Sequence, residues 1–137
     1  MAEPEWLLMI DGAARGNPGP AGCGAAICDE NGVVVRELSR YLGHATNNVA
    51  EYEALLMGLE VLIELKRKKI VVQSDSQLLV RQLNGQYRVK DEKLKVLHQR
   101  ATGLLRQFAA YRIVHVRREF NKIADRLANR GIDDGER

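Results

Sequence analysis

Four carboxylates stand at the edges of regular segments of this 137-residue sequence and could together bind metal. They are Asp11, Glu51, Asp75 and Asp125. Taken singly, each has an ordinary explanation: a turn residue, a capping-box glutamate, a helix N-cap and a first-turn helical acid, respectively. Gathered at one place, they would repel one another unless a cation held them, and hard divalent ions such as Mg²⁺ prefer oxygen ligands. Two such ions would activate a water and stabilise the leaving oxygen of a phosphodiester.

The strands that end in Asp11 and Asp75 are expected to bring these two side chains to the same end of a sheet. "WLLMID" (6–11) and "KIVVQSD" (69–75) are apolar runs that each finish in an aspartate. A helical segment between them would act as a right-handed crossover, which makes the two strands parallel neighbours. Open α/β sheets bind ligands at this end of their strands.

The other segments predict the elements that must position these acids. Two further strands, joined by the turn "ENG", form an antiparallel meander with the first strand. The long helical segment between the strands that end in Asp11 and Asp75 is the first of four helices. After the strand that ends in Asp75 come two helices, a fifth strand and a last helix, in an order typical of an α/β domain. The predicted strands are 6–11, 21–29, 33–42, 69–75 and 111–119, and the predicted helices are 47–69, 76–85, 91–108 and 121–131.

Local signals also predict how the helices begin and end. Asn48 and Glu51 have the spacing of a capping box, and the basic residues at 66–69 would close the long helix where its dipole favours cations. Asn121 is the expected N-cap of the last helix, and Gly131 is its expected stop.

Composition indicates a single domain over residues 1–137, with a core of about residues 6–132 and a short flexible C-terminal tail. No apolar run is long enough to span a membrane, and the acidic N-terminus lacks a secretory signal, so we expect a cytoplasmic protein without a membrane partner. Cys23 and Cys28 lie five residues apart in one expected strand, on opposite faces. They cannot form a disulfide with each other, and both are expected to be buried.

The charges are unevenly distributed along the chain. Residues 1–80 carry 7 Lys and Arg against 11 Asp and Glu, a net charge of −4, whereas residues 81–137 carry 14 against 7, a net charge of +7. A basic half suggests a polyanionic partner, and an acidic half with isolated carboxylates suggests metal. Ordinary solubilising surface charge is the alternative.

Four motifs in register resemble the type 1 ribonuclease H family: "DGAARGNPGPAG", "TNNVAEYEAL", "SDSQLLVRQL" and "NKIADRLAN", over about residues 6–132. The resemblance implies a ribonuclease H-like α/β fold, with a five-stranded mixed sheet of three antiparallel and then two parallel strands, flanked by helices. It also implies an endonuclease that cuts the RNA strand of RNA/DNA hybrids with two Mg²⁺ or Mn²⁺ ions and leaves 5′-phosphate and 3′-hydroxyl ends. Asp11, Glu51, Asp75 and Asp125 match the family's catalytic, metal-binding acids.

The same resemblance implies substrate contacts beside these acids. Asn17, Asn47, Asn48 and Gln77 match the family's contacts to the minor groove of the hybrid. Amide side chains suit this role because the 2′-hydroxyl that marks RNA is both a donor and an acceptor. Asn17 could instead, or in addition, be a turn residue, and Asn47 and Asn48 could be helix caps.

The sequence departs from the best-known bacterial pattern at two places. "GQYRVKDEK" is too short for the basic, tryptophan-bearing protrusion of some relatives, and "VRREFN" replaces a histidine-bearing loop. Arg118 is therefore the candidate for a group near the leaving phosphate, with a surface or phosphate-positioning role equally open. His115 falls within the fifth strand, where a structural role is expected. These short segments resemble the archaeal and plant-like members of the family.

Other functions remain as alternatives at this point. The same fold serves structure-specific nucleases and binding modules, so a nuclease of broader specificity that also cuts double-stranded RNA is one alternative, and a nucleic-acid-binding module is another. A dinucleotide-binding enzyme would need G-x-G-x-x-G between a strand and a helix, a spacing that is missing here. The expected partner is an RNA/DNA hybrid, bound by a monomer.

Overall fold

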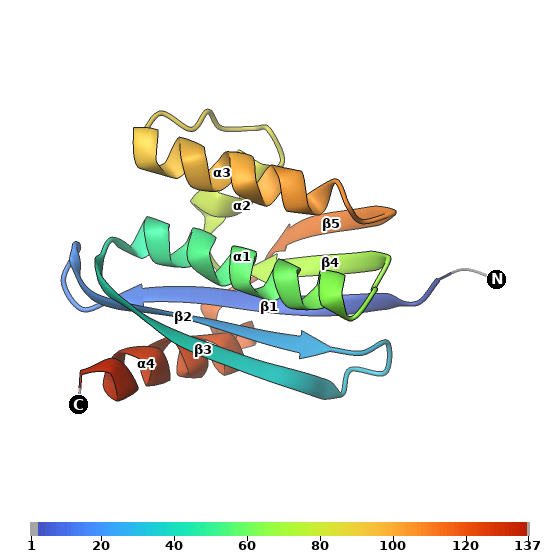
Figure 1. Cartoon of the computed structure of the whole chain (residues 1–137), viewed down its shortest axis with the longest axis horizontal. Helices are drawn as coiled ribbons and strands as arrows, with labels where there is room; N and C mark the ends of the chain where they lie inside the picture. The colour runs from blue at the N-terminus through green and yellow to red at the C-terminus, as the bar shows by residue number, and fades with distance from the viewer. Residues whose placement is uncertain (1–2, 137) are drawn as a thin grey trace.

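The computed structural model describes residues 3–136, which form one five-stranded mixed sheet with helices on both faces (Figure 1). The strands lie in the order β3-β2-β1-β4-β5. Their bounds are β1 Glu5–Ala14, β2 Gly19–Cys28, β3 Val34–Ala45, β4 Lys69–Ser74 and β5 Ala110–His115. The helices are α1 Asn47–Glu64, α2 Gln77–Leu83, α3 Glu92–Leu105 and α4 Lys122–Gly135, with a 3-10 turn η1 at Arg118–Phe120.

The pairing of the strands confirms the predicted sheet. β1, β2 and β3 pair antiparallel, whereas β1 and β4, and then β4 and β5, pair parallel. Ile10 lies opposite Ser74 in the β1–β4 register, so the next residues, Asp11 and Asp75, leave the pair at the same end. The crossover through α1 therefore brings the two aspartates together, as the sequence predicts.

Apolar residues form separate cores on the two faces of the sheet. In Figure 1, α1, α2 and α3 lie above the sheet and α4 lies below it. Cys23 belongs to the upper core, and Cys28 belongs to the core between the sheet and α4. Both are buried and free, which confirms that they lie on opposite faces and do not pair with each other. Burial raises the pKa of the Cys23 thiol to about 11.

Helix α4 packs directly on the backbone of β2 because β2 has glycine at the contact. A Cβ atom at Gly24 would come within 2.4 Å of the Ala128 nitrogen and 2.6 Å of the Ala124 oxygen. No side chain fits in this space. The close approach seats the first turn of α4, which carries Asp125, against the sheet.

The helix boundaries correct two of the predictions for α1. Thr46 is the N-cap, and its hydroxyl accepts a hydrogen bond from Val49 N, so Asn48 lies inside the helix and forms no capping box. The helix ends at Glu64, and Lys66 has a positive φ of 58°. The basic residues at 66–69 therefore follow the helix, because the chain has already turned toward β4.

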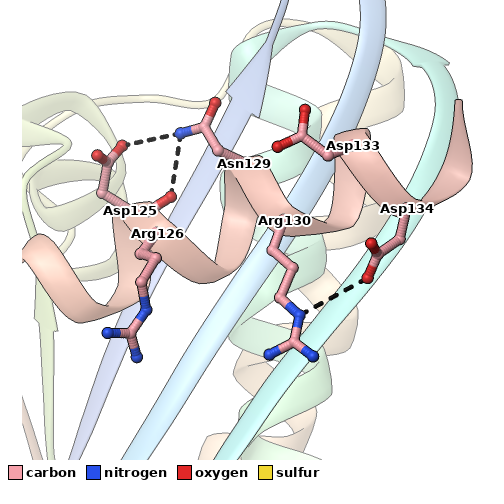
Figure 2. Close-up of a pocket in the computed structure, with 6 residues that line it drawn as sticks. All are labelled: Asp125, Arg126, Asn129, Arg130, Asp133 and Asp134. Carbon is pink, nitrogen blue, oxygen red and sulfur yellow. Dashed lines mark hydrogen bonds and ion pairs between the residues drawn. The ribbon is translucent and has the colours of Figure 1, made fainter.

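The C-terminal part also differs from the prediction. β5 ends at His115 rather than continuing to residue 119. α4 passes through Gly131 and ends at Gly135, with Arg130 Nε 3.6 Å from an Asp134 carboxylate oxygen (Figure 2). Gly131 is needed for packing, since a Cβ there would lie 2.6 Å from the Arg40 carbonyl oxygen. The expected flexible tail is therefore helical through residue 135, and residue 137 lies outside the described residues.

None of the helices within residues 3–136 combines the length and the apolar character needed to cross a lipid bilayer.

Candidate functional site

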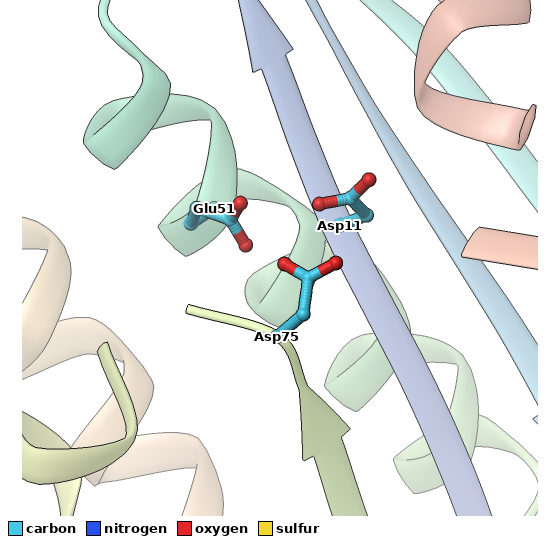
Figure 3. A group of neighbouring side chains, drawn as sticks. All are labelled: Asp11, Glu51 and Asp75. Carbon is cyan, nitrogen blue, oxygen red and sulfur yellow. The ribbon is translucent and has the colours of Figure 1, made fainter. Parts of the chain in front are cut away.

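Three of the four predicted carboxylates converge at the carboxyl ends of β1 and β4. Asp11 lies in β1, Glu51 in the second turn of α1, and Asp75 immediately after β4, and their side chains point toward one another (Figure 3). One carboxylate oxygen from each of the three lies within 4.8 Å of the others. We call Asp11, Glu51 and Asp75 the acidic trio.

Two members of the acidic trio are buried, and the third, Asp75, is half-buried. Asp11 is 5% exposed and Glu51 is 7% exposed. Within residues 3–136, Glu51 Oε2 and Asp75 Oδ2 are buried without a hydrogen-bond partner. Buried charged oxygens without partners are costly, and a hard divalent cation is the kind of group that would compensate them. The donor set therefore fits a divalent metal ion.

The electrostatics of the acidic trio lead to the same conclusion. Burial, and then the charge of Asp75, raises the pKa of Asp11 to about 8. Burial and the charge of Asp11 hold the pKa of Glu51 well above its usual range. Burial also raises the pKa of Asp75, although a hydrogen bond from Asn121 and the charge of Arg118 act against this shift. Without a cation, the three groups cannot all ionise at neutral pH without a large cost.

Asp125 borders the acidic trio but is not part of it. It lies in the first turn of α4, and its carboxyl group raises the pKa of Asp11 through a side-chain hydrogen bond and through its charge. Asn129 Nδ2 lies 3.3 Å from Asp125 Oδ1 and donates to it (Figure 2). Asp125 thus reaches Asp11 from the helix below the sheet, whereas Glu51 reaches it from above.

The turn between β1 and β2 is fastened to the start of α1 by two asparagines. Asn47 Oδ1 accepts a hydrogen bond from Ala14 N at 2.8 Å, and Asn17 Oδ1 accepts one from Asn47 N at 3.0 Å. Their carbonyl oxygens are thus used structurally. Asn17 has the turn role that was the alternative for it, whereas neither Asn47 nor Asn48 is a helix cap, because Thr46 is the N-cap of α1. Both side chains are exposed, and for their NH₂ groups the structure shows no partner among residues 3–136.

A surface cavity of about 420 Å³ joins this turn to the start of α3. Asn17 and Asn48 line it, so two of the predicted substrate contacts face the same space. Thr46, His44 and Lys93 line it as well, and sequence reasoning missed them as site residues. Only Thr46 had a signal, because it precedes the two asparagines in the "TNN" motif.

The remaining predicted contacts lie near Asp75. Gln77 is the exposed first residue of α2, after the N-cap Ser76. Arg118 lies in η1, and its charge lowers the pKa of Asp75. With Glu119 and Asp125, it lines a cavity of about 510 Å³. The structure therefore brings Arg118 to the border of the acidic trio.

His115 lies in β5, as predicted, but at the end of the strand. It is the last residue of β5, where the strand reaches the surface, and it lies opposite Ser74 with its side chain exposed. Its imidazole lies near enough to Asp75 to act toward a lower pKa of that carboxyl group. The strand was predicted to run on past this residue, which placed His115 too far inside it.

Comparison with known proteins gives consistent matches along the chain. The family model described as "Reverse transcriptase-like" matches residues 9–131. Ribonuclease HI of Halobacterium salinarum is 43% identical over 125 residues, which cover 91% of this chain and 63% of that protein. Ribonuclease H of Coxiella burnetii is 34% identical, with 93% of this chain and 89% of that protein covered.

Two solved structures are similar throughout. RNase H1 from Halobacterium salinarum superimposes with a TM-score of 0.92 at 41% identity, covering 95% of this chain and 98% of that one. LC11-RNase H1, solved in complex with an RNA/DNA hybrid, gives a TM-score of 0.92 at 41% identity, covering 96% and 99%. Some relatives are longer: the matched region spans 63% of the Halobacterium protein and 35% of a bifunctional protein from Mycobacterium tuberculosis that is 42% identical over 128 residues.

Proposed function

Because this chain belongs to the type 1 ribonuclease H family, we propose that it is an endoribonuclease that hydrolyses the RNA strand of RNA/DNA hybrids. The products would carry 5′-phosphate and 3′-hydroxyl ends. The observation that carries the proposal is the convergence of Asp11, Glu51 and Asp75 within 4.8 Å, with buried oxygens that lack partners in residues 3–136.

The four acids would hold the cofactor. The ligands from β1, α1 and the end of β4 would be Asp11, Glu51 and Asp75. Asp125 would approach from α4. Two divalent ions, Mg²⁺ or Mn²⁺, would when bound lower the pKa of the attacking water and neutralise charge on the leaving oxygen. The protein's own contribution is to keep the four carboxylates in fixed positions on rigid elements, so that little reorganisation accompanies the reaction.

Amide side chains would recognise the hybrid. Asn17, Asn47, Asn48 and Gln77 are all exposed next to the acids. The NH₂ groups of Asn17 and Asn47 can donate to 2′-hydroxyls and base edges in the minor groove, because among residues 3–136 only the carbonyl oxygens of these side chains are engaged. LC11-RNase H1, which is similar over 96% of this chain, was solved with an RNA/DNA hybrid, and this supports the same substrate here.

Arg118 would act on the phosphate beside the acids. Its guanidinium lies near enough to Asp75 to influence that carboxyl group, and it lines the same cavity as Asp125. A guanidinium there would contact a phosphate oxygen of the RNA strand by charge-assisted hydrogen bonds.

A gel assay tests the proposal directly. End-labelled RNA/DNA hybrid, double-stranded RNA, double-stranded DNA and single strands are incubated with Mg²⁺ or with Mn²⁺, and again with a chelator. We expect internal cuts in the RNA of the hybrid only, abolished by the chelator. Cleavage of double-stranded RNA at a comparable rate would support the nuclease of broader specificity, and binding without cleavage would support the binding module.

A further inference from the structure

The side chain of Asn121 is engaged by the acidic site rather than by the helix that it precedes. Asn121 stands at the N-cap position of α4 but makes no side-chain cap bond, and it is 0% exposed. Its Nδ2 donates instead to the carbonyl oxygen of Ile10 at 2.8 Å. The same side chain lies close enough to the Asp75 carboxyl group to lower its pKa.

The two groups beside the Asn121 amide belong to the two strands that carry the aspartates of the acidic trio. Ile10 immediately precedes Asp11 in β1, and Asp75 immediately follows β4. An amide NH₂ group has two hydrogens, and the bond to Ile10 uses one of them, so the other is left to face Asp75. Asn121 Oδ1 is buried without a partner in residues 3–136. A fully buried amide therefore lies between the end of β1 and the Asp75 carboxylate.

The segment that carries Asn121 is itself fixed to β4. Gln73 Nε2 donates to the Phe120 carbonyl oxygen at 3.0 Å, and Val116 N donates to the Ser74 carbonyl oxygen at 2.9 Å. Both bonds come from the last two residues of β4, directly before Asp75. The amide thus has a position set by the sheet, and it can hold a carboxylate in place.

We propose that Asn121 is a positioning residue that fixes the Asp75 carboxylate relative to Asp11, so that the acidic trio is arranged for a divalent ion before the ion binds. This inference rests on the proposed function, since it assigns a ligand role to the trio. Loss of the amide leaves the Ile10 carbonyl without its donor and the Asp75 carboxylate without its polar neighbour, and it allows the carboxylate to rotate. Partners of this outer kind typically change metal affinity by about 10- to 100-fold.

The test compares Asn121→Ala with the control Asn84→Ala. Asn84 also donates from Nδ2 to a strand carbonyl, that of Ile113 at 3.2 Å, but it lies at the opposite end of α2 from Asp75. Mg²⁺ affinity is measured by titration calorimetry and by the Mg²⁺-dependent rise in Tm, and kcat and KM are measured on a hybrid. For Asn121→Ala we expect Mg²⁺ affinity lower by about 10-fold or more, a lower kcat that partly recovers at high Mg²⁺, and an unchanged KM. For Asn84→Ala we expect the parent's Mg²⁺ affinity.

A lower Tm in Asn121→Ala with the parent's Mg²⁺ affinity and kcat would overturn the proposal and leave only a structural role. Should the alanine variant fail to fold, Asn121→Ser gives the same comparison, because its shorter hydroxyl can serve at most one of the two acceptors. A parent that cuts no hybrid, but whose Mg²⁺ affinity falls in Asn121→Ala and not in Asn84→Ala, would contradict the proposed function and still support the positioning role.

Discussion

Gly12 lies against the backbone of Glu51 so closely that a Cβ atom on the glycine would come within 2.3 Å of the Glu51 nitrogen. The neighbouring Ala50 carbonyl carbon would lie 2.4 Å away. Because both contacts are to helix backbone, no side-chain movement can relieve them. The distance between β1 and α1, and with it the distance from Asp11 to Glu51, therefore depends on the missing side chain at residue 12.

Gly12→Ala should push α1 away from β1 and reduce both stability and metal binding. Overpacking of this kind costs about 1–3 kcal/mol, which is measured by urea unfolding. Gly103→Ala is the matched control, because a Cβ at this position in α3 meets open space. It should stabilise the helix by about 0.5–1 kcal/mol. Equal stability and equal Mg²⁺ affinity in Gly12→Ala and the parent would contradict the packing argument.

Asp11→Asn distinguishes a metal ligand from a turn residue. A neutral amide binds Mg²⁺ poorly, so cleavage should be nearly abolished and the rise in Tm caused by Mg²⁺ should shrink. Without metal, the variant should be as stable as the parent or more stable, because one of several mutually repelling carboxyl groups is removed. Asp29→Asn serves as the control, since Asp29 is a turn residue whose Oδ1 accepts from Asn31 N and Val33 N, and asparagine can accept the same bonds. An active Asp11→Asn protein with the parent's metal response would show that Asp11 is only a turn residue.

The raised pKa of Asp11 predicts how the stability of the metal-free protein depends on pH. Its pKa rises from an ordinary 3.8 to about 8 in the folded protein. An acid with a raised folded pKa contributes its stability below the unfolded pKa and loses it as pH rises through the folded pKa. The free energy of unfolding in the presence of a chelator should therefore fall between about pH 4 and pH 8.

In Asp11→Asn this decline should be smaller, because the titrating group is absent. The measurement is urea unfolding at several pH values with a chelator present. A parent and a variant whose free energies of unfolding run parallel across this pH range would refute the assignment to Asp11.

The salt dependence of binding tests whether basic side chains at separate positions on the surface bind the hybrid. Arg118 lies beside the acids. Lys90 immediately precedes Asp91, which lines the same cavity as Lys93 and Asn17. Arg118→Ala and Lys90→Ala should each weaken hybrid binding and lower the slope of log affinity against log salt by about 1. Arg118→Ala should also lower kcat, if the guanidinium contacts the reacting phosphate.

The control for these variants is Arg36→Ala. In the strand register Arg36 of β3 lies opposite Ile27 of β2, and Ile27 lies opposite Leu8 near the start of β1. Arg36 therefore lies toward the opposite end of the sheet from Asp11. Its loss should leave the salt slope unchanged. An unaltered affinity in both Arg118→Ala and Lys90→Ala would mean that the hybrid binds elsewhere.

The sequence predicted the features that depend on chain order and strand pairing. The crossover rule was enough to place Asp11 and Asp75 side by side, and the hairpin signals were enough for the meander. Helix ends were less predictable: Asn48 has capping-box spacing, but the hydroxyl of Thr46 is the group that meets a free helix amide. Capping depends on which backbone groups the turn exposes, and sequence spacing does not determine this.

The role of Asn121 could not be predicted, because it depends on contact across the fold. Its position before a helix indicated an N-cap, whereas its amide bonds to Ile10, which lies 111 residues earlier in the chain. Gly131 likewise looked like a helix stop and instead makes room for the Arg40 backbone. In both cases a tertiary contact, and not the local signal, determined the use of the residue.

The three carboxylates of the acidic trio come from positions 11, 51 and 75, on three segments that meet only when α1 has crossed over and β4 has docked beside β1. In the unfolded chain, bringing these three segments together means closing two long loops, and each closure costs conformational entropy. No short fragment of the chain therefore gathers the three carboxylates. The antiparallel meander, in contrast, pairs segments that are neighbours in the chain. A divalent ion held by these three carboxylates would therefore add its stability only after the β1–α1–β4 unit has assembled.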